Sequence, residues 1–153
     1  MRNPRPHPDP RRPRRAVLSS VSSDSHTWNL VYLQLLLEEA EFEVTNLGAC
    51  VPPEMLAERA LDVRPDLILL SSVNGHGGLQ AAAYAQLIKA QPALAGTPLV
   101  IGGKLGVAGA ADRGLVPELI EAGFDGVFVG DEAVAEFREY LDRVRPHTVV
   151  AAA

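Results

Sequence analysis

The chain lacks the features of a membrane protein or of a disulfide-bonded secreted protein. Its 153 residues contain a single cysteine, Cys50, which excludes an intramolecular disulfide and fits a reducing cytosol. No uninterrupted apolar run approaches the roughly 20 residues that a membrane-spanning helix needs. No apolar stretch with a small-residue cleavage site follows the first basic residues, as a secretory signal requires. We therefore expect a cytoplasmic protein without a membrane partner, and the length suits one compact domain.

Positive charge is scarce outside the first residues. Residues 1–15 hold six arginines against one aspartate, a net side-chain charge of +5, whereas the whole chain carries −5; the rest therefore carries −10. Five prolines in this segment exclude a helix, and little in it is apolar. We predict a disordered basic arm over 1–15, a folded domain over 16–145 and a flexible tail over 146–153. The arm is open to several interpretations: a solvated leader, a misplaced start, or a contact for nucleic acid or an acidic partner. The acidic body argues against nucleic acid as the main partner.

Strand and helix patterns alternate through the body of the chain. Short runs rich in β-formers predict strands at 16–22, 42–47, 67–72, 98–101 and 126–129. Helical patterns occupy 28–40, 52–61, 79–90, 116–122 and 132–144. Five such units in a row imply an α/β fold: a doubly wound, five-stranded parallel sheet in the flavodoxin-like or Rossmann-like order 2-1-3-4-5.

Ligands of such sheets bind beyond the carboxyl ends of the strands, so the loops there are the candidate binding sites, and several known ligand-binding patterns do not fit them. A phospho-acceptor receiver domain needs an acid after the third strand, where Ser71 and Ser72 stand. A nucleotide-binding P-loop is absent, because Lys104 is followed by leucine and not by a hydroxyl residue. A flavin-phosphate loop is only half satisfied, since its serines lack a glycine. A zinc site needs more cysteine and histidine in ligand spacing than the chain offers.

The loop after the first strand carries Asp24-x-His26. An imidazole can bind a metal through one ring nitrogen while a nearby carboxylate accepts a hydrogen bond from the other. A single protein ligand implies that a cofactor, such as a macrocycle, supplies the remaining ligands. Taken alone, such a pair more often consists of a helix-capping aspartate and a surface histidine.

Two further motifs, linked to the first, favour the ligand-binding interpretation of Asp24 and His26. Asp24-x-His26-x-x-Asn29, Ser71-x-Val73 and Gly102-Gly103 follow the first, third and fourth predicted strands. The pattern resembles the cobalamin (B12)-binding domain family, whose signature is Asp-x-His-x-x-Gly, Ser-x-Leu and Gly-Gly. The resemblance covers roughly residues 15–144. Within that family the chain is most similar to the small subunit of glutamate mutase (methylaspartate mutase), on the stretches 23–26, 47–54, 71–77, 102–103 and 123–127.

The resemblance implies a role for each motif. His26 would be the lower axial ligand of the cobalamin cobalt, and Asp24 its hydrogen-bonded partner. Ser71 would meet the displaced dimethylbenzimidazole tail, and the paired glycines would let that tail approach the backbone closely. No catalytic residue is expected in this chain. The expected cofactor-binding residues are Ser23, Asp24, Ser25, His26, Thr27, Asn29, Ser71, Ser72, Val73, Gly102, Gly103, Lys104, Leu105, Gly106, Val107, Ala108, Gly130 and Asp131.

Two positions depart from the family pattern. Asn29 replaces the family glycine, and asparagine tolerates a left-handed backbone better than most residues. Lys104 replaces an asparagine and would reach a phosphate or point to solvent. Trp28, beside the first motif, would either cover the cofactor or hold the following helix against the sheet.

The resemblance also implies an activity. With adenosylcobalamin, such a subunit serves a radical isomerase that shifts a carbon skeleton, here L-glutamate to threo-3-methylaspartate. The chain lacks the barrel that encloses substrate, so we expect a separate large barrel-type catalytic subunit that holds most of the amino-acid substrate. Two alternatives stay open: a corrinoid carrier for methyl transfer, which usually brings an extra helical domain, and a non-catalytic cobalamin-binding or sensory module.

Overall fold

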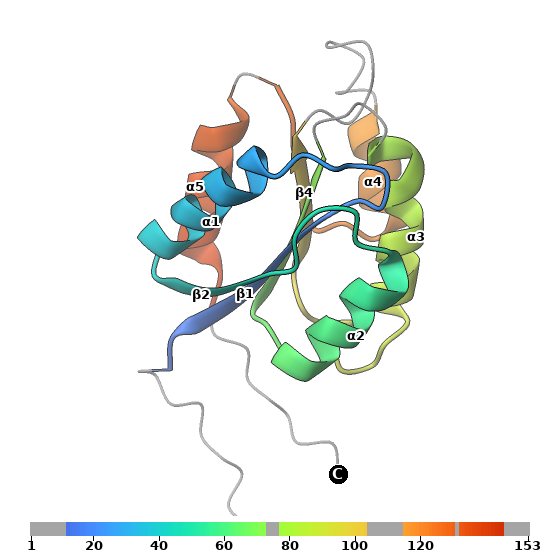
Figure 1. The fold of residues 1–153 in the computed structure, drawn as a ribbon, viewed down its shortest axis with the longest axis horizontal. Helices are drawn as coiled ribbons and strands as arrows, with labels where there is room; N and C mark the ends of the chain where they lie inside the picture. The colour runs from blue at the N-terminus through green and yellow to red at the C-terminus, as the bar shows by residue number, and fades with distance from the viewer. Residues whose placement is uncertain (1–11, 73–76, 104–114, 131, 146–153) are drawn as a thin grey trace, which may run out of the picture.

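The computed structural model describes residues 12–72, 77–103, 115–130 and 132–145. Most of the predicted basic arm and all but the first residues beyond the last helix lie outside these ranges. Within them, strands and helices alternate in the predicted order (Figure 1). None of the helices in these ranges is long and apolar enough to cross a membrane.

The strands form one parallel sheet. Their bounds are β1 Arg14–Ser20, β2 Phe42–Asn46, β3 Leu67–Ser72, β4 Leu99–Gly103 and β5 Gly126–Phe128. Their order in the sheet is β2-β1-β3-β4-β5, which confirms the predicted topology. The central strand β3 is buried along its whole length, because helices cover it on both sides and its sequence is an unbroken apolar run ending in two serines.

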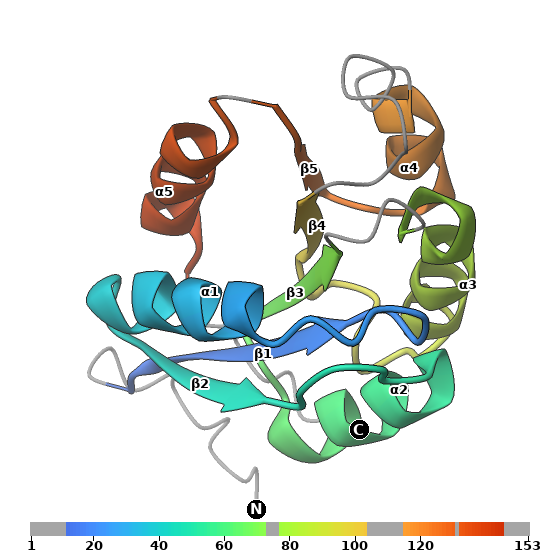
Figure 2. The ribbon, with the colours of Figure 1, turned by 45° about the horizontal axis from the view of Figure 1, so that its top comes forward.

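The helices divide between the two faces of the sheet (Figure 2). Their bounds are α1 Trp28–Glu39, α2 Pro53–Val63, α3 Gly77–Lys89, α4 Val116–Ala122 and α5 Ala133–Arg143. Helices α1 and α5 cover one face, and α2, α3 and α4 cover the other. The doubly wound α/β fold is thereby confirmed.

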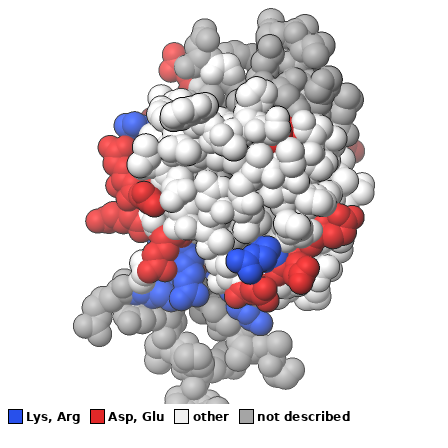
Figure 3. Space-filling model, in the orientation of Figure 1, with Lys and Arg blue, Asp and Glu red and all other residues white. Residues whose placement is uncertain are grey.

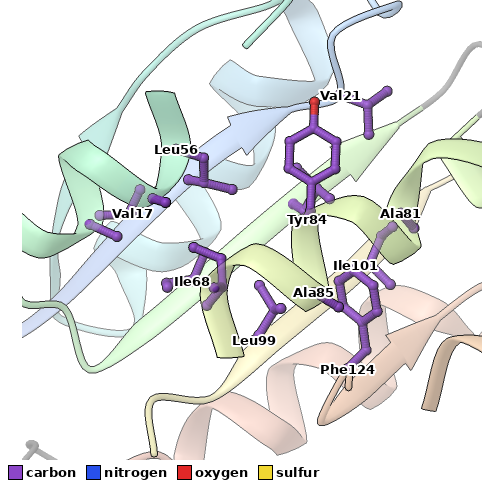
Figure 4. Packing of buried hydrophobic residues seen from close by; sticks show 14 of the residues in the cluster. Val17, Val21, Leu56, Ile68, Ala81, Tyr84, Ala85, Leu99, Ile101 and Phe124 are labelled. Atoms are coloured by element: carbon purple, nitrogen blue, oxygen red, sulfur yellow. The ribbon is translucent and has the colours of Figure 1, made fainter. Parts of the chain in front are cut away.

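The face under α2, α3 and α4 is a filled apolar layer. Strand residues such as Ile68 and Ile101 meet Leu56 of α2, Tyr84 of α3 and Phe124 after α4 (Figure 4). Tyr84 is fully buried, yet its polar end is satisfied. Its hydroxyl donates to the carbonyl of Val51 at 2.5 Å and accepts from the N–H of Ser22 at 2.7 Å.

The opposite layer depends on an arginine that sequence patterns assign to the disordered arm. Arg14 begins β1, two residues before the predicted strand start. Its guanidinium donates to the carbonyls of Leu141, at 2.6 Å, and Val144, at 3.1 Å, at the end of α5. It also donates to the carbonyl of Ala40 at the end of α1 and lies 4.1 Å from the ring centroid of Phe42. A cation there satisfies carbonyls that helix ends leave unpaired, so Arg14 links α1 to α5.

The next residues of the same segment hold the strand in register. The buried carboxylate of Asp66, just before β3, accepts from the backbone N–H of Arg15 and from the guanidinium of Arg12, both at 2.8 Å. The N–H of Asp66 in turn donates to the carbonyl of Arg15 at 2.7 Å. These bonds hold the residues that enter β1 beside the start of β3.

Candidate functional site

The carboxyl ends of three neighbouring strands lie side by side. In the sheet register, Ser20 of β1 pairs with Ser71 of β3, and Ser71 pairs with Gly102 of β4. Ser72, which is buried, pairs with Gly103. The three predicted motifs therefore meet at one edge of the sheet, where parallel α/β folds place their ligands.

The loop after β1 presents an imidazole that a buried carboxylate holds. Oδ1 of Asp24 accepts from the backbone N–H of His26 at 2.9 Å and from its ring Nδ1 at 2.7 Å. Because an ionised carboxylate only accepts hydrogen bonds, the neutral ring has its proton on Nδ1 and its lone pair on Nε2. Asp24 is fully buried, whereas the His26 side chain is 60% exposed. The arrangement provides an accessible nitrogen donor whose orientation is fixed from behind.

Backbone contacts fix this loop on its neighbours. The carbonyl oxygen of Asp24 accepts from the hydroxyl of Ser20 at 2.9 Å and from the N–H of Cys50 at 3.0 Å. Tyr84 of α3 binds the N–H of Ser22 in the same loop, and burial raises the pKa of Tyr84. The carboxylate that orients His26 is therefore tied to the first strand and to the loop after β2.

A cavity of about 200 Å³ lies between α1 and α5, above the carboxyl half of the sheet. Its lining consists of Asn29, Tyr32, Leu33, Leu36, Leu69, Ser71, Gly102, Gly103, Phe128, Ala133, Val134 and Phe137. Apart from Asn29, Ser71 and the glycines, these side chains are apolar or aromatic. An apolar protein cavity of ~150 Å³ holds a benzene molecule, so this one has room for a larger flat ring.

Predicted site residues form the floor of this cavity and, through Asn29, part of its α1 wall, whereas the other helical side chains of the lining were not predicted. Ser71, Gly102 and Gly103 were predicted site residues, whereas Tyr32 of α1 and Phe137 of α5 were not. The available signal was the apolar content of α1, which exceeds what one sheet-facing stripe requires. That signal alone gives no position for a cavity.

The paired glycines have reasons within the sheet itself. Gly103 has φ +107°, and a Cβ there would collide with the backbone carbonyl oxygen of Ser72. A Cβ on Gly102 would lie 3.2 Å from the carbonyl oxygen of Phe128, a tight contact. The sequence suggested close approach of a cofactor as the reason for both glycines. The structure adds an intramolecular reason for each, and both residues also border the cavity.

Asn29 connects the first motif to the second. It lies in the first turn of α1, so the left-handed backbone considered from the sequence does not arise. Its Nδ2 donates to the hydroxyl oxygen of Ser71 at 2.7 Å. Its Oδ1 is buried and has no hydrogen-bond partner among the described residues. Both side chains of the pair line the cavity.

The remaining predicted residues do not line the cavity or lie outside the described ranges. Ser25 and Thr27 flank His26 and are exposed, and the hydroxyl of Ser23 donates to Gln80 at 2.9 Å. Gly130, after β5, has φ +89°. Seven predicted residues lie outside the described ranges: Val73, Lys104, Leu105, Gly106, Val107, Ala108 and Asp131.

The outer side of α1 carries an unusual run of exposed apolar side chains. Trp28 is 84% exposed, and Val31, Tyr32 and Leu35 follow it at three, four and seven residues, all exposed. This spacing places them on one side of the helix. Trp28 therefore does not hold α1 against the sheet, which removes one of its two predicted roles. Figure 3 shows an uncharged surface in this region, with acidic side chains along its left edge.

Comparisons with known proteins agree with the motifs. The model of the B12 binding domain family matches residues 14–138. The glutamate mutase sigma subunit of Halobacterium salinarum is 35% identical over 78% of this chain and 81% of its own length. That of Treponema denticola is also 35% identical, over 73% and 80%.

A solved structure shows the same fold. A cobalamin-binding protein from Desulfitobacterium hafniense matches with a TM-score of 0.67 at 21% identity, over 86% of this chain and 59% of that one. At this identity the likeness supports the architecture alone. The family match covers most of the folded region, and its signature motifs converge at one edge of the sheet; the chain belongs to the B12-binding domain family.

Proposed function

We propose that this chain binds cobalamin through His26 and serves as the small subunit of an adenosylcobalamin-dependent mutase similar to glutamate mutase. One observation carries the proposal: the exposed imidazole of His26, oriented by buried Asp24, stands three residues before Asn29, which lines an apolar cavity bordered by Gly102 and Gly103. The relatives named glutamate mutase sigma subunit support the mutase role.

The residues present fit a cobalamin. Nε2 of His26 would bind the cobalt, because Nδ1 is already engaged by Asp24. The cavity between α1 and α5 would take the nucleotide tail with its flat base. Gly102 and Gly103 form part of the cavity lining, where a bound group could approach their backbone closely. The orphaned Oδ1 of Asn29 is the kind of buried polar atom that a bound group would satisfy.

Each protein group would act on binding and orientation. Asp24 would keep the proton on Nδ1 and thereby strengthen the imidazole as a metal donor. The bonds from Ser20 and Cys50 to the Asp24 carbonyl would hold that carboxylate in place. When bound, adenosylcobalamin supplies a carbon radical through homolysis of its cobalt–carbon bond. Conversion of L-glutamate to threo-3-methylaspartate would then take place mainly against the partner subunit.

The apolar stripe on α1 supports a protein partner. Trp28 begins this stripe two residues after His26, so a protein that covers a cofactor at His26 would also contact Trp28, Val31 and Leu35. Exposed apolar side chains that form a contiguous patch are typical of interaction surfaces. We assign this surface to the large barrel-type catalytic subunit.

Cobalamin binding can be tested on the purified chain. When adenosylcobalamin is added to the chain, we expect the absorption spectrum of the cofactor to change, because His26 would replace the cofactor's own base as the lower ligand of the cobalt. His26→Ala should weaken binding at least as much as the 10- to 100-fold typical of lost outer-shell partners. His147→Ala, at a histidine near the end of the chain, is the matched control and should bind normally. Equal binding by wild type and His26→Ala would remove the ligand role of His26.

Mutase activity requires a second assay. The chain, adenosylcobalamin and a glutamate mutase large subunit should together convert L-glutamate to 3-methylaspartate, and omission of any component should abolish conversion. Tight cobalamin binding without conversion would contradict the mutase role and favour a corrinoid carrier or a sensory module.

A further inference from the structure

We propose that Asn29 and Ser71 select the base of the bound cobamide, favouring one that places an amino or N–H donor beside a ring-nitrogen acceptor. The inference rests on the proposed function, because it places the nucleotide tail in the cavity between α1 and α5. It adds a preference among tails that the family motif does not specify, since the motif has glycine at position 29.

The hydrogen bonds of the pair define what it can offer a ligand. Asn29 uses Nδ2 on the hydroxyl oxygen of Ser71, at 2.7 Å. A hydroxyl that accepts one bond still has its own proton to donate, and no described residue accepts the proton of Ser71. Oδ1 of Asn29 remains without a partner among the described residues. The pair therefore presents one donor and one acceptor side by side.

The surroundings make these two groups selective. Leu69, Phe128 and Phe137 on the same cavity lining have no polar side-chain atoms to replace a missing partner. A buried polar group left unpaired lowers affinity by roughly 5- to 150-fold. A ligand that pairs with both Asn29 and Ser71 is thus favoured over one that pairs with Ser71 alone.

Two bases differ in this respect. Dimethylbenzimidazole offers a ring nitrogen that can accept from the Ser71 hydroxyl, but it has no N–H for Oδ1 of Asn29. Adenine offers ring nitrogens together with an exocyclic amino group. In protein–DNA complexes one asparagine pairs with an adenine edge through its own N–H and carbonyl oxygen; here the hydroxyl of Ser71 would supply the donor and Oδ1 of Asn29 the acceptor. The geometry of the pair therefore favours the aminopurine.

The test compares three corrinoids on the full chain: adenosylcobalamin, its counterpart with adenine as the lower base, and adenosylcobinamide, which lacks the nucleotide. Trp28 is the only tryptophan of the sequence and lies two residues from His26, so quenching of its fluorescence reports binding. We expect the adenine form to bind about tenfold more tightly than adenosylcobalamin, equivalent to ~1.4 kcal/mol, and the cobinamide to bind most weakly.

Substitutions assign the preference to the pair. Asn29→Ala should bring the ratio between the two nucleotide forms close to one. Asn46→Ala, at the exposed last residue of β2, is the matched control and should retain the wild-type ratio. Circular dichroism and thermal melting verify that each variant is folded.

The outcomes separate this inference from the proposed function. If none of the three corrinoids binds, the proposed function fails. If both nucleotide forms bind the wild type equally, or if Asn29→Ala keeps the preference, the selection by Asn29 is overturned. Equal binding of the cobinamide would show that the cavity does not hold the nucleotide tail, which also overturns it.

Discussion

The two faces of the sheet differ in how completely the chain covers them. Under α2, α3 and α4, large side chains such as Tyr84 and Phe124 are enclosed on all sides. Under α1 and α5, the same sheet borders a cavity of about 200 Å³, and α1 exposes Trp28 and Leu35 to solvent. The chain itself fills one face, and we propose that a ligand and a partner complete the other. The difference implies that stability depends mainly on the first face and function on the second.

Matched core truncations test this contrast with the largest expected effect. Phe124 and Phe137 are nearly equally buried, on opposite faces. Phe124→Ala leaves a new cavity in a filled layer and should lower the free energy of unfolding by about 4 kcal/mol. Phe137→Ala enlarges a cavity that already exists and should cost about 3 kcal/mol, the low end for such changes. Urea denaturation measures the two losses of unfolding free energy. Equal losses, or a larger loss for Phe137→Ala, would contradict the difference between the two faces.

Gly103, on the floor of the cavity under α1 and α5, leaves no space for a Cβ. A comparison with Gly48, which also has a positive φ, tests how much this lack of space matters. Gly103→Ala adds a collision with the Ser72 carbonyl to the backbone strain, and we expect a loss of about 3–4 kcal/mol. Gly48 has φ +88° but nothing within 4 Å of a Cβ, so Gly48→Ala should cost only about 1–2 kcal/mol. Equal losses in thermal or urea unfolding would mean that space at Gly103 is not limiting.

Arg14 forms hydrogen bonds to both helices that cover the cavity face of the sheet, α1 and α5. Arg14→Met removes the bonds to the ends of α1 and α5 while keeping an apolar stem, and should destabilise the protein by about 2–3 kcal/mol. Arg15 is its neighbour, with an exposed side chain 3.8 Å from Glu43. Arg15→Met should cost under ~1 kcal/mol. If the two variants unfold at the same urea concentration, Arg14 does not hold the helices together.

The filled face should respond to alkaline pH. Burial, and to a smaller extent the charge of Glu54, raises the pKa of Tyr84, while its hydrogen bond from Ser22 opposes the rise. The folded state therefore prefers the neutral phenol. The stability that this group contributes is complete below about pH 10 and is lost as the pH rises through the raised value. Tyr84→Phe should lose about 1 kcal/mol at neutral pH and show a smaller alkaline decline. An unchanged alkaline decline in the variant would assign that effect to another group.

The fold and the core of the candidate site were predictable because their signals are local. The apolar run at 67–72 predicted the central strand, and the alternation of elements predicted the strand order. Asp24 and His26 are two residues apart, so their hydrogen bond follows from spacing within one loop. Topology then brings the Ser71 and Gly102 motifs beside them.

Other parts depend on contacts between distant segments. The cavity exists because α1 and α5 leave space between them, and no sequence pattern encodes that separation. The bond from Asn29 to Ser71 joins residues 42 positions apart. Arg14 looked like part of a basic arm, since its role depends on carbonyls at Ala40 and Leu141 that only the folded chain brings together.

We propose that His26 is the protein ligand of a cobalamin held at the face covered by α1 and α5. Electron paramagnetic resonance of the chain loaded with the Co(II) form of cobalamin tests it most directly, using protein labelled with ¹⁵N and unlabelled cofactor. A ¹⁴N ligand splits each cobalt line into a triplet, whereas a ¹⁵N ligand gives a doublet. We predict a doublet for the labelled protein, a triplet for the unlabelled protein, and loss of the protein-derived splitting in His26→Ala. A triplet that persists in the labelled protein would place the cofactor's own base on the cobalt and contradict the account.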